Sequence, residues 1–141
     1  MSIEKTAEGD KYTAVNVGPL SNLSAYENGK VFLKDATKLT GSEVSLTVYP
    51  PGASIPFFHS HKTHEEVYIV INGEGEFQVD NDVFPIKEGS VIRVGTGGSR
   101  NLKNTGTAPM TVVCFQSVEN TLTGDLFADC DIPQTEPKFT K

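Results

Sequence analysis

Residues 59–73 of the chain read HSHKTHEEVYIVING, and this stretch contains both a strand-like run and a cluster of histidines and glutamates. Its second half, residues 66–71, consists mainly of β-branched and aromatic side chains, which is typical of a strand. The run ends at Asn72-Gly73, a pair that favours the type I′ turn of a hairpin. We therefore expect a strand over residues 66–71 that pairs with a second strand over residues 75–79.

Similar short strand-like runs occupy much of the remaining chain, with hardly any helical periodicity between them. Turn signals such as Pro50-Pro51-Gly52 and Asp80-Asn81-Asp82 separate these runs. Pro85 has no backbone N–H to donate, so its strand is expected at a sheet edge or to end there. The pattern predicts an all-β sandwich or barrel. The further expected strands cover residues 42–49, 83–86, 90–94, 99–104 and 110–117.

All three histidines of the chain lie within residues 59–64, directly before two glutamates. Side chains two positions apart on a strand point to the same face, so His59 and His61 can converge on one point. Two imidazoles with one carboxylate form a ligand set that suits Fe, and imidazole also suits Zn, Cu and Ni. The competing interpretation is a surface loop whose histidines merely neighbour acidic residues.

Strand parity favours Glu66 over Glu65 as the carboxylate of this set. Glu66 shares a face with Tyr68 and Val70, whereas the face of Glu65 is uniformly apolar, and a carboxylate buried there would be costly. Tyr68, on the same face as Glu66, is a candidate for contacting a bound ligand, although such a tyrosine often only packs. His64 is a weaker candidate, either as an extra ligand or as a residue beside the ligands.

The stretch from Gly52 to Gly73 resembles the first conserved motif of the cupins. That motif runs glycine, a short segment, His-x-His, three or four residues, glutamate, six residues, glycine, and here it selects His59, His61 and Glu66. The segment after Gly52 is one residue longer than usual in the family. The family spacing and the parity argument therefore agree on the same glutamate.

The second cupin motif is matched in spacing but not in every residue. It maps onto Gly89, then Gly95-Thr96-Gly97, then Arg100 and finally Asn104. Gly95 stands where the family has proline, and Arg100 stands where metal-binding cupins have a histidine that is the fourth metal ligand. Arginine has only hydrogen-bond donors and stays protonated, so Arg100 cannot take over that role.

Three arrangements are open for Arg100. In the first, its side chain lies at the rim of a site held by His59, His61 and Glu66, where it binds a substrate carboxylate or phosphate. In the second, Arg100 turns inward and pairs with Glu66 in place of the metal. In the third, His64 serves as a substitute ligand.

The resemblance implies an all-β, single-domain cupin with a jelly-roll barrel, also called a double-stranded β-helix. We expect an N-terminal extension with early strands over residues 1–40, the barrel core over 41–118, and a tail over 119–141 that packs outside the barrel. The resemblance further implies a homodimer. It suggests one divalent metal ion, with Fe, Mn, Zn, Ni and Cu as the candidates.

The function implied is a metal-dependent enzyme of the oxygenase, isomerase or decarboxylase class, acting on a small polar or anionic substrate. The alternative is a non-catalytic module that binds a small molecule such as a sugar or an anion, with or without metal. The chain has 141 residues and a net charge of −6, without a basic run, which disfavours nucleic acids and anionic membranes as partners. The N-terminus lacks the apolar core of a signal peptide, and we expect a cytoplasmic protein.

Overall fold

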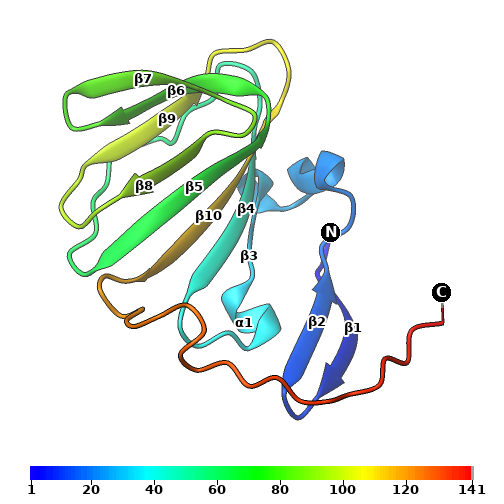
Figure 1. The fold of residues 1–141 in the computed structure, drawn as a ribbon. Helices are drawn as coiled ribbons and strands as arrows, with labels where there is room; N and C mark the ends of the chain where they lie inside the picture. The colour runs from blue at the N-terminus through cyan, green and yellow to red at the C-terminus, as the bar shows by residue number, and fades with distance from the viewer. Residues whose placement is uncertain (141) are drawn as a thin grey trace.

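The computed structural model describes residues 1–140, and strands dominate it (Figure 1). Eight strands form two facing sheets. The larger sheet has the order β3-β4-β10-β5-β8 and the smaller sheet has the order β7-β6-β9. The larger sheet consists of β3 (Lys30–Phe32), β4 (Glu43–Tyr49), β5 (His64–Asn72), β8 (Val91–Val94) and β10 (Met110–Val118). The smaller sheet consists of β6 (Glu74–Val79), β7 (Asp82–Lys87) and β9 (Arg100–Asn104).

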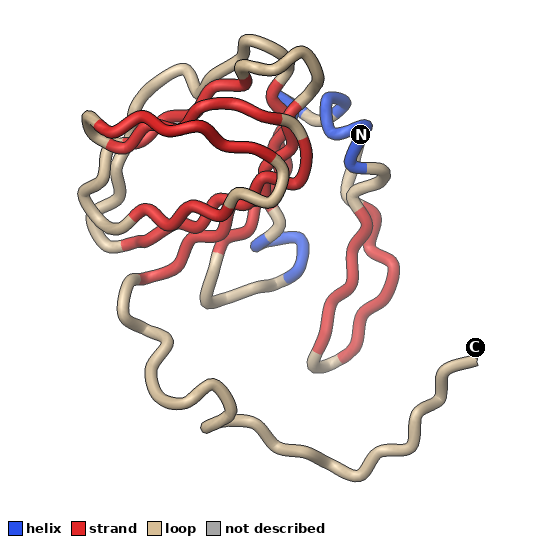
Figure 2. Tube along the Cα trace, turned by 45° about the horizontal axis from the view of Figure 1, so that its top comes forward, coloured by secondary structure: helices blue, strands red, loops and turns tan. Residues whose placement is uncertain are grey.

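The two sheets curve toward each other and enclose a barrel, which Figure 2 shows nearly along its axis. Every pairing within these sheets is antiparallel. The predicted all-β jelly-roll fold is therefore confirmed. Side chains alternate between the barrel interior and the outside, as the period of a strand requires. The core residues come from both sheets: Tyr68, Val70, Phe77, Ile86, Ile92, Val94, Leu102, Met110 and Val112.

The predicted hairpin between residues 66–71 and 75–79 is wrong. β5 pairs with β10 and β8, whereas β6 pairs with β7 and β9, so the chain passes from one sheet to the other at Gly73. Gly73 has a φ of 89°, and a Cβ atom there would lie 2.7 Å from the Cα of Met110. The local sequence specified the glycine turn, but strands distant in sequence supply both neighbours of β5.

The second expected turn is present. β6 and β7 form an antiparallel hairpin that closes with Val79 opposite Asp82, and Asp80 in the turn has a φ of 51°. β7 is an edge strand of the smaller sheet and contains Pro85. The expected edge position of this strand is therefore confirmed. Its unpaired side leaves room for a residue that cannot donate a backbone hydrogen bond.

The segments on either side of the barrel differ in how they pack. β1 (Glu4–Gly9) and β2 (Tyr12–Asn16) form a hairpin that stands apart from the barrel (Figures 1 and 2). The next segments, η1 (Leu20–Ala25), η2 (Glu27–Gly29) and β3, place Leu23, Tyr26 and Val31 in a small second core. The short helix α1 (Lys34–Thr37) leads into β4.

The C-terminal tail follows β10 and takes an irregular path. All residues from 120 to 140 are exposed, so packing of this tail against the outside of the barrel is not seen within the described chain. Nothing in the tail forms a helix or strand up to residue 140. Within residues 1–140, the structure contains no helix with the length and apolar character needed to cross a membrane.

Candidate metal centre

His59 and His61 lie on the loop that enters β5, and backbone hydrogen bonds join this loop to β9 and to the loop before β9. His59 forms an isolated β-bridge with Arg100, in which the Arg100 amide donates to the His59 carbonyl at 2.9 Å. The carbonyl of His61 accepts a hydrogen bond from the amide of Gly97 at 2.9 Å. These backbone contacts explain why both imidazoles stay at one end of the barrel.

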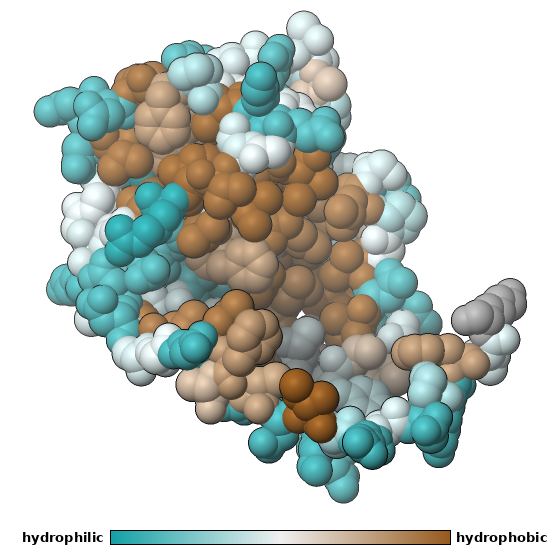
Figure 3. Space-filling view, in the orientation of Figure 1, coloured by the Kyte–Doolittle hydropathy of each residue, from teal (hydrophilic) through white to brown (hydrophobic). Residues whose placement is uncertain are grey.

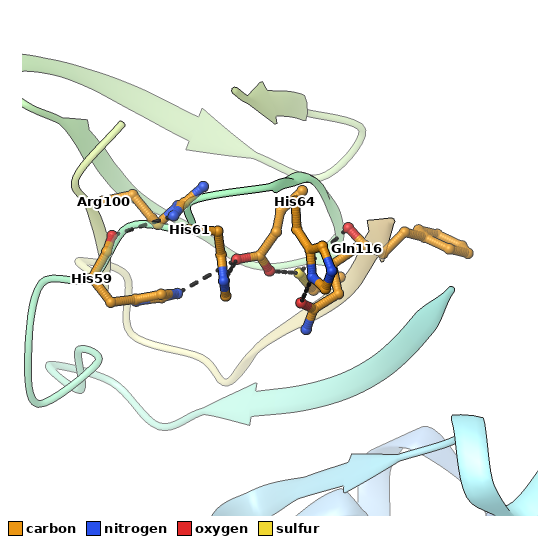
Figure 4. A network of polar contacts seen from close by, with 8 residues as sticks. His59, His61, His64, Arg100 and Gln116 are labelled. Atoms are coloured by element: carbon orange, nitrogen blue, oxygen red, sulfur yellow. Dashed lines mark hydrogen bonds and ion pairs between the residues drawn. The ribbon is translucent and has the colours of Figure 1, made fainter. Parts of the chain in front are cut away.

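Glu66 comes from β5 itself and is buried, with 4% of its surface exposed. Its neighbours across the sheet are Gln116 in β10 and Val94 in β8. Its Oε1 lies 2.6 Å from His61 Nε2 and 3.4 Å from His59 Nε2, and Figure 4 shows the two imidazoles turned toward this point. The structure therefore brings together the three residues that the sequence singles out as candidate ligands.

The chemistry of this donor set fits a divalent metal ion. One ligand atom from each residue can be chosen so that all lie within 4.8 Å of one another. Despite the two nearby imidazole nitrogens, Glu66 Oε1 accepts no hydrogen bond from any residue between 1 and 140 and is completely buried. A buried carboxylate oxygen with no donor is costly, and a metal ion would satisfy it.

The second carboxylate oxygen of Glu66 accepts a hydrogen bond from a residue that the sequence did not reveal as part of the site. The thiol of Cys114 donates to Glu66 Oε2 at a sulfur–oxygen distance of 2.7 Å. Cys114 stands on β10, directly opposite Tyr68 on β5. This contact cannot be predicted from the sequence, because the register between β10 and β5 cannot be read from either strand alone.

The electrostatics of the centre keep Glu66 and His59 in the protonation states that metal binding requires. Burial by itself would raise the pKa of Glu66, but the Cys114 hydrogen bond and the nearby positive groups outweigh burial and lower that pKa. Burial is the main cause that lowers the pKa of His59, assisted by the charge of Arg100 and opposed by Glu66. The carboxylate is therefore ionised and the His59 imidazole neutral near neutral pH, which is what a metal requires.

Arg100 lies inside the barrel, not at the rim where the first arrangement placed it. None of its surface is exposed, because the inward side of β9 presents Arg100, Leu102 and Asn104 to the interior. Arg100 makes no ion pair with Glu66 or with any other residue that the structure describes, so the second arrangement is not observed either. Its Nη1 donates to the His59 carbonyl at 3.3 Å (Figure 4).

The family model of the cupin domain matches residues 45–116, just over half of the chain. The chain belongs to the cupin family. The match runs from β4 to β10 and therefore includes all three candidate ligands and Arg100. The resemblance inferred from the two spaced motifs is confirmed.

Known proteins resemble this cupin over different lengths. A cupin protein of Bacteroides fragilis is 29% identical, with a TM-score of 0.77, and the match covers 89% of this chain and 99% of that one. A predicted oxalate decarboxylase of Thermotoga maritima is 27% identical, with a TM-score of 0.57, over 63% of this chain and 78% of that one. An oxalate-binding protein of Thermotoga maritima is 39% identical over 40% of this chain and 46% of its own length.

This cupin spans about half the length of the curated relatives that it matches. The Bacteroides structure is more informative about the parts outside the barrel. Its match covers 89% of this chain, which is more than the barrel core and the whole C-terminal tail together, so it includes part of the N-terminal extension. Part of that extension therefore has a counterpart in another cupin.

Two further candidate residues take different places in this cupin. His64 Nδ1 lies 3.0 Å from Gln116 Oε1, and the His64 ring stacks on the His61 ring with centroids 6.0 Å apart. Because His64 is outside the cluster of converging ligand atoms, it is placed to orient His61, not to replace a ligand. Tyr68 is buried and packs edge-on against Phe77 at a centroid distance of 5.0 Å.

Proposed function

We propose that this cupin holds one divalent metal ion through His59, His61 and Glu66 and acts through it on a small polar or anionic molecule. The observation that carries this proposal is the convergence of the three ligand atoms around Glu66 Oε1, which no described residue donates to. Three protein ligands leave positions on the ion for water and substrate, as in catalytic metal sites.

A bound ion of this kind supplies Lewis-acid chemistry by polarising or chelating the substrate. The chain itself contributes the ligands, the buried charge of Arg100, and a wall of core side chains that excludes water from the inner side of the site. Oxygenation, isomerisation and decarboxylation are reactions that such a centre supports. The similarity to a predicted oxalate decarboxylase supports the choice of a small anionic substrate.

Non-catalytic binding at the same centre is the second candidate function. Burial is the leading cause that raises the pKa of the Tyr68 hydroxyl and of the Cys114 thiol, so both groups stay protonated at neutral pH. Neither group can then serve as a base or as an anionic nucleophile beside the metal ligands. The similarity to an oxalate-binding protein also supports this second function.

The metal proposal is tested by elemental analysis of protein purified without a nickel column or chelator. We expect close to one equivalent of Fe, Mn, Zn, Ni or Cu per chain in the wild type. The double variant His59→Ala/His61→Ala should lose this metal, whereas His64→Ala, which removes the third histidine, should retain most of it. Wild-type protein that contains no metal and takes up no added Fe(II), Mn(II) or Zn(II) would refute the proposed function.

A further inference from the structure

Arg100 is a completely buried cation whose hydrogen-bonding capacity is mostly unused. Its Nη1 has one partner, the His59 carbonyl at 3.3 Å. Nε and Nη2 are buried and donate to no residue within the described part of the chain. These two nitrogens form one edge of the guanidinium, with two parallel N–H donors at the spacing of a carboxylate. The unused edge of Arg100 is therefore suited to an anionic partner.

The position of Arg100 places its charge beside the metal centre, where it influences the pKa values of both His59 and Glu66. Arg100 pairs with His59 through backbone hydrogen bonds in both directions, at 2.9 and 3.4 Å, so the arginine and a metal ligand stand side by side. Figure 4 shows Arg100 next to His59 and on the same side of the centre. The side chains of His59 and His61 are each 29% exposed, so the centre is partly open to solvent at the residues next to Arg100.

Charge balance indicates what kind of anion this is. A divalent ion, one carboxylate ligand, two neutral imidazoles and one guanidinium leave the centre with a net charge of about +2. In a buried site such a charge is unfavourable until an anion compensates it. A molecule with one negative group leaves part of the charge uncompensated, whereas a molecule with two negative groups neutralises the centre.

We propose that Arg100 makes this centre selective for small dicarboxylates, one carboxylate binding the free edge of Arg100 while the other faces the metal side. This inference rests on the proposed metal centre and names the class of its ligand. Arg100 replaces the fourth protein ligand of metal-binding cupins with a positive charge, so metal and dicarboxylate favour each other's binding. By linkage, each raises the affinity for the other by the same factor.

The guanidinium must turn slightly to meet a ligand, since its free edge has no contact with solvent. One long hydrogen bond to a backbone carbonyl holds it, and this bond is weaker than bidentate pairing with a carboxylate. Replacing the hydrogen bond to the His59 carbonyl by bidentate pairing with a carboxylate therefore favours ligand binding. Binding is therefore accompanied by a local movement of the Arg100 side chain.

The test is calorimetric titration of oxalate, the smallest dicarboxylate, into Co(II)-loaded protein and into metal-free protein, with acetate as the single-charge control. Bound metal is measured before and after each titration. The variants are Arg100→Gln and Arg100→Lys, both checked by circular dichroism. The matched control is Arg93→Gln, because Arg93 is an exposed arginine on β8 that pairs with Glu119.

We expect oxalate to bind the Co(II)-loaded wild type and the Co(II)-loaded Arg93→Gln variant with the same affinity. Oxalate should bind the metal-free protein much more weakly. Acetate should also bind the loaded protein much more weakly than oxalate does. Arg100→Gln should keep its metal and lose oxalate affinity by at least about 30-fold. If that variant does not fold, Arg100→Lys is used instead. Lysine cannot bind a carboxylate bidentately, so this variant should also bind oxalate more weakly than the wild type. Metal-loaded Arg100 variants that bind oxalate as tightly as the wild type would overturn this inference and leave the metal centre standing. Wild-type protein without metal would overturn both.

Discussion

Arg100 is a residue whose burial is costly unless a ligand is present. Two of its three nitrogens lack partners among residues 1–140, and nothing in the described chain neutralises its charge at contact distance. We expect Arg100→Met to stabilise the metal-free protein by roughly 2 kcal/mol, because it removes unsatisfied donors and fills the same space. Urea unfolding measures the change, with Arg93→Met as the exposed control. A clear loss of stability would mean that Arg100 has a structural role.

Cys114 holds the orientation of Glu66, the carboxylate of the proposed metal site. Its thiol donates to Glu66 Oε2, which leaves Oε1 directed at the two imidazoles. We expect Cys114→Ala to weaken metal binding about 10-fold or more, as loss of a residue that holds a ligand commonly does. Cys114→Ser keeps a donor and should retain most of the affinity. Metal titration by calorimetry measures both variants, and the exposed Cys130→Ala serves as control. Equal affinities in all of these proteins would contradict the role given to Cys114.

His59 makes the stability of the metal-free protein depend on pH. Its pKa in the folded protein lies below the ordinary value of 6.5, so as pH falls through that value the unfolded chain takes up the proton first. The contribution of His59 to the free energy of unfolding should therefore be constant above about pH 7 and decline as the solution is acidified below about 6.5.

Urea unfolding of wild type and His59→Gln at about pH 7.5 and about pH 5.5 measures this decline. The variant should lose less stability than the wild type over this interval, since it has no imidazole to titrate at this position. Identical declines in the two proteins would show that His59 does not cause the effect.

At the level of the elements, Asn104 joins the end of β9 to two other segments. Its side-chain amide donates to the carbonyls of Tyr49 and Ala108 at 2.8 Å each, and its Oδ1 accepts from the amide of Gly106 at 2.9 Å. Asn104 is completely buried, so the backbone groups that it contacts could not form hydrogen bonds with water if its side chain were removed. The asparagine of the second motif thus fixes the turn after β9 against the end of β4.

We expect Asn104→Ala to destabilise the protein by roughly 3 kcal/mol, because it leaves several buried backbone groups without partners. Lys103→Ala, an exposed change on the same strand, should alter the free energy of unfolding by less than about 0.5 kcal/mol. Urea unfolding of both variants measures the difference. Similar small effects from the two substitutions would show that the turn is held by other contacts.

At the level of the whole molecule, the larger sheet has an uncovered outer apolar face, formed by Val67, Ile69, Ile71, Val113 and Phe115. Phe115 lies opposite Val67 and Val113 opposite Ile69, and both Phe115 and Ile71 are 40% exposed. Figure 3 shows hydrophobic residues gathered over β5, β10 and β4 on this side. The β1–β2 hairpin also lacks cover, since every residue of β1 is exposed, and an isolated hairpin is marginally stable.

We expect a second copy of the chain to cover the outer apolar face, giving a homodimer in solution. Light scattering after size exclusion should give twice the mass of the chain for the wild type, and the mass of one chain for Phe115→Glu. Val83→Glu changes an exposed valine on the smaller sheet and should leave the dimer intact. A monomeric wild type at micromolar concentration would contradict this expectation.

The sequence by itself determined the fold class, most strand positions and the three candidate ligands. Those features depend on local rules, because the period of a strand places Glu66 with Tyr68 and the motif spacing places His59 beside His61. Only the tertiary structure decided the partners of β5, the inward direction of Arg100 and the contact between Cys114 and Glu66. Each of these depends on the register between strands that are far apart in the chain, and packing of the whole barrel sets that register.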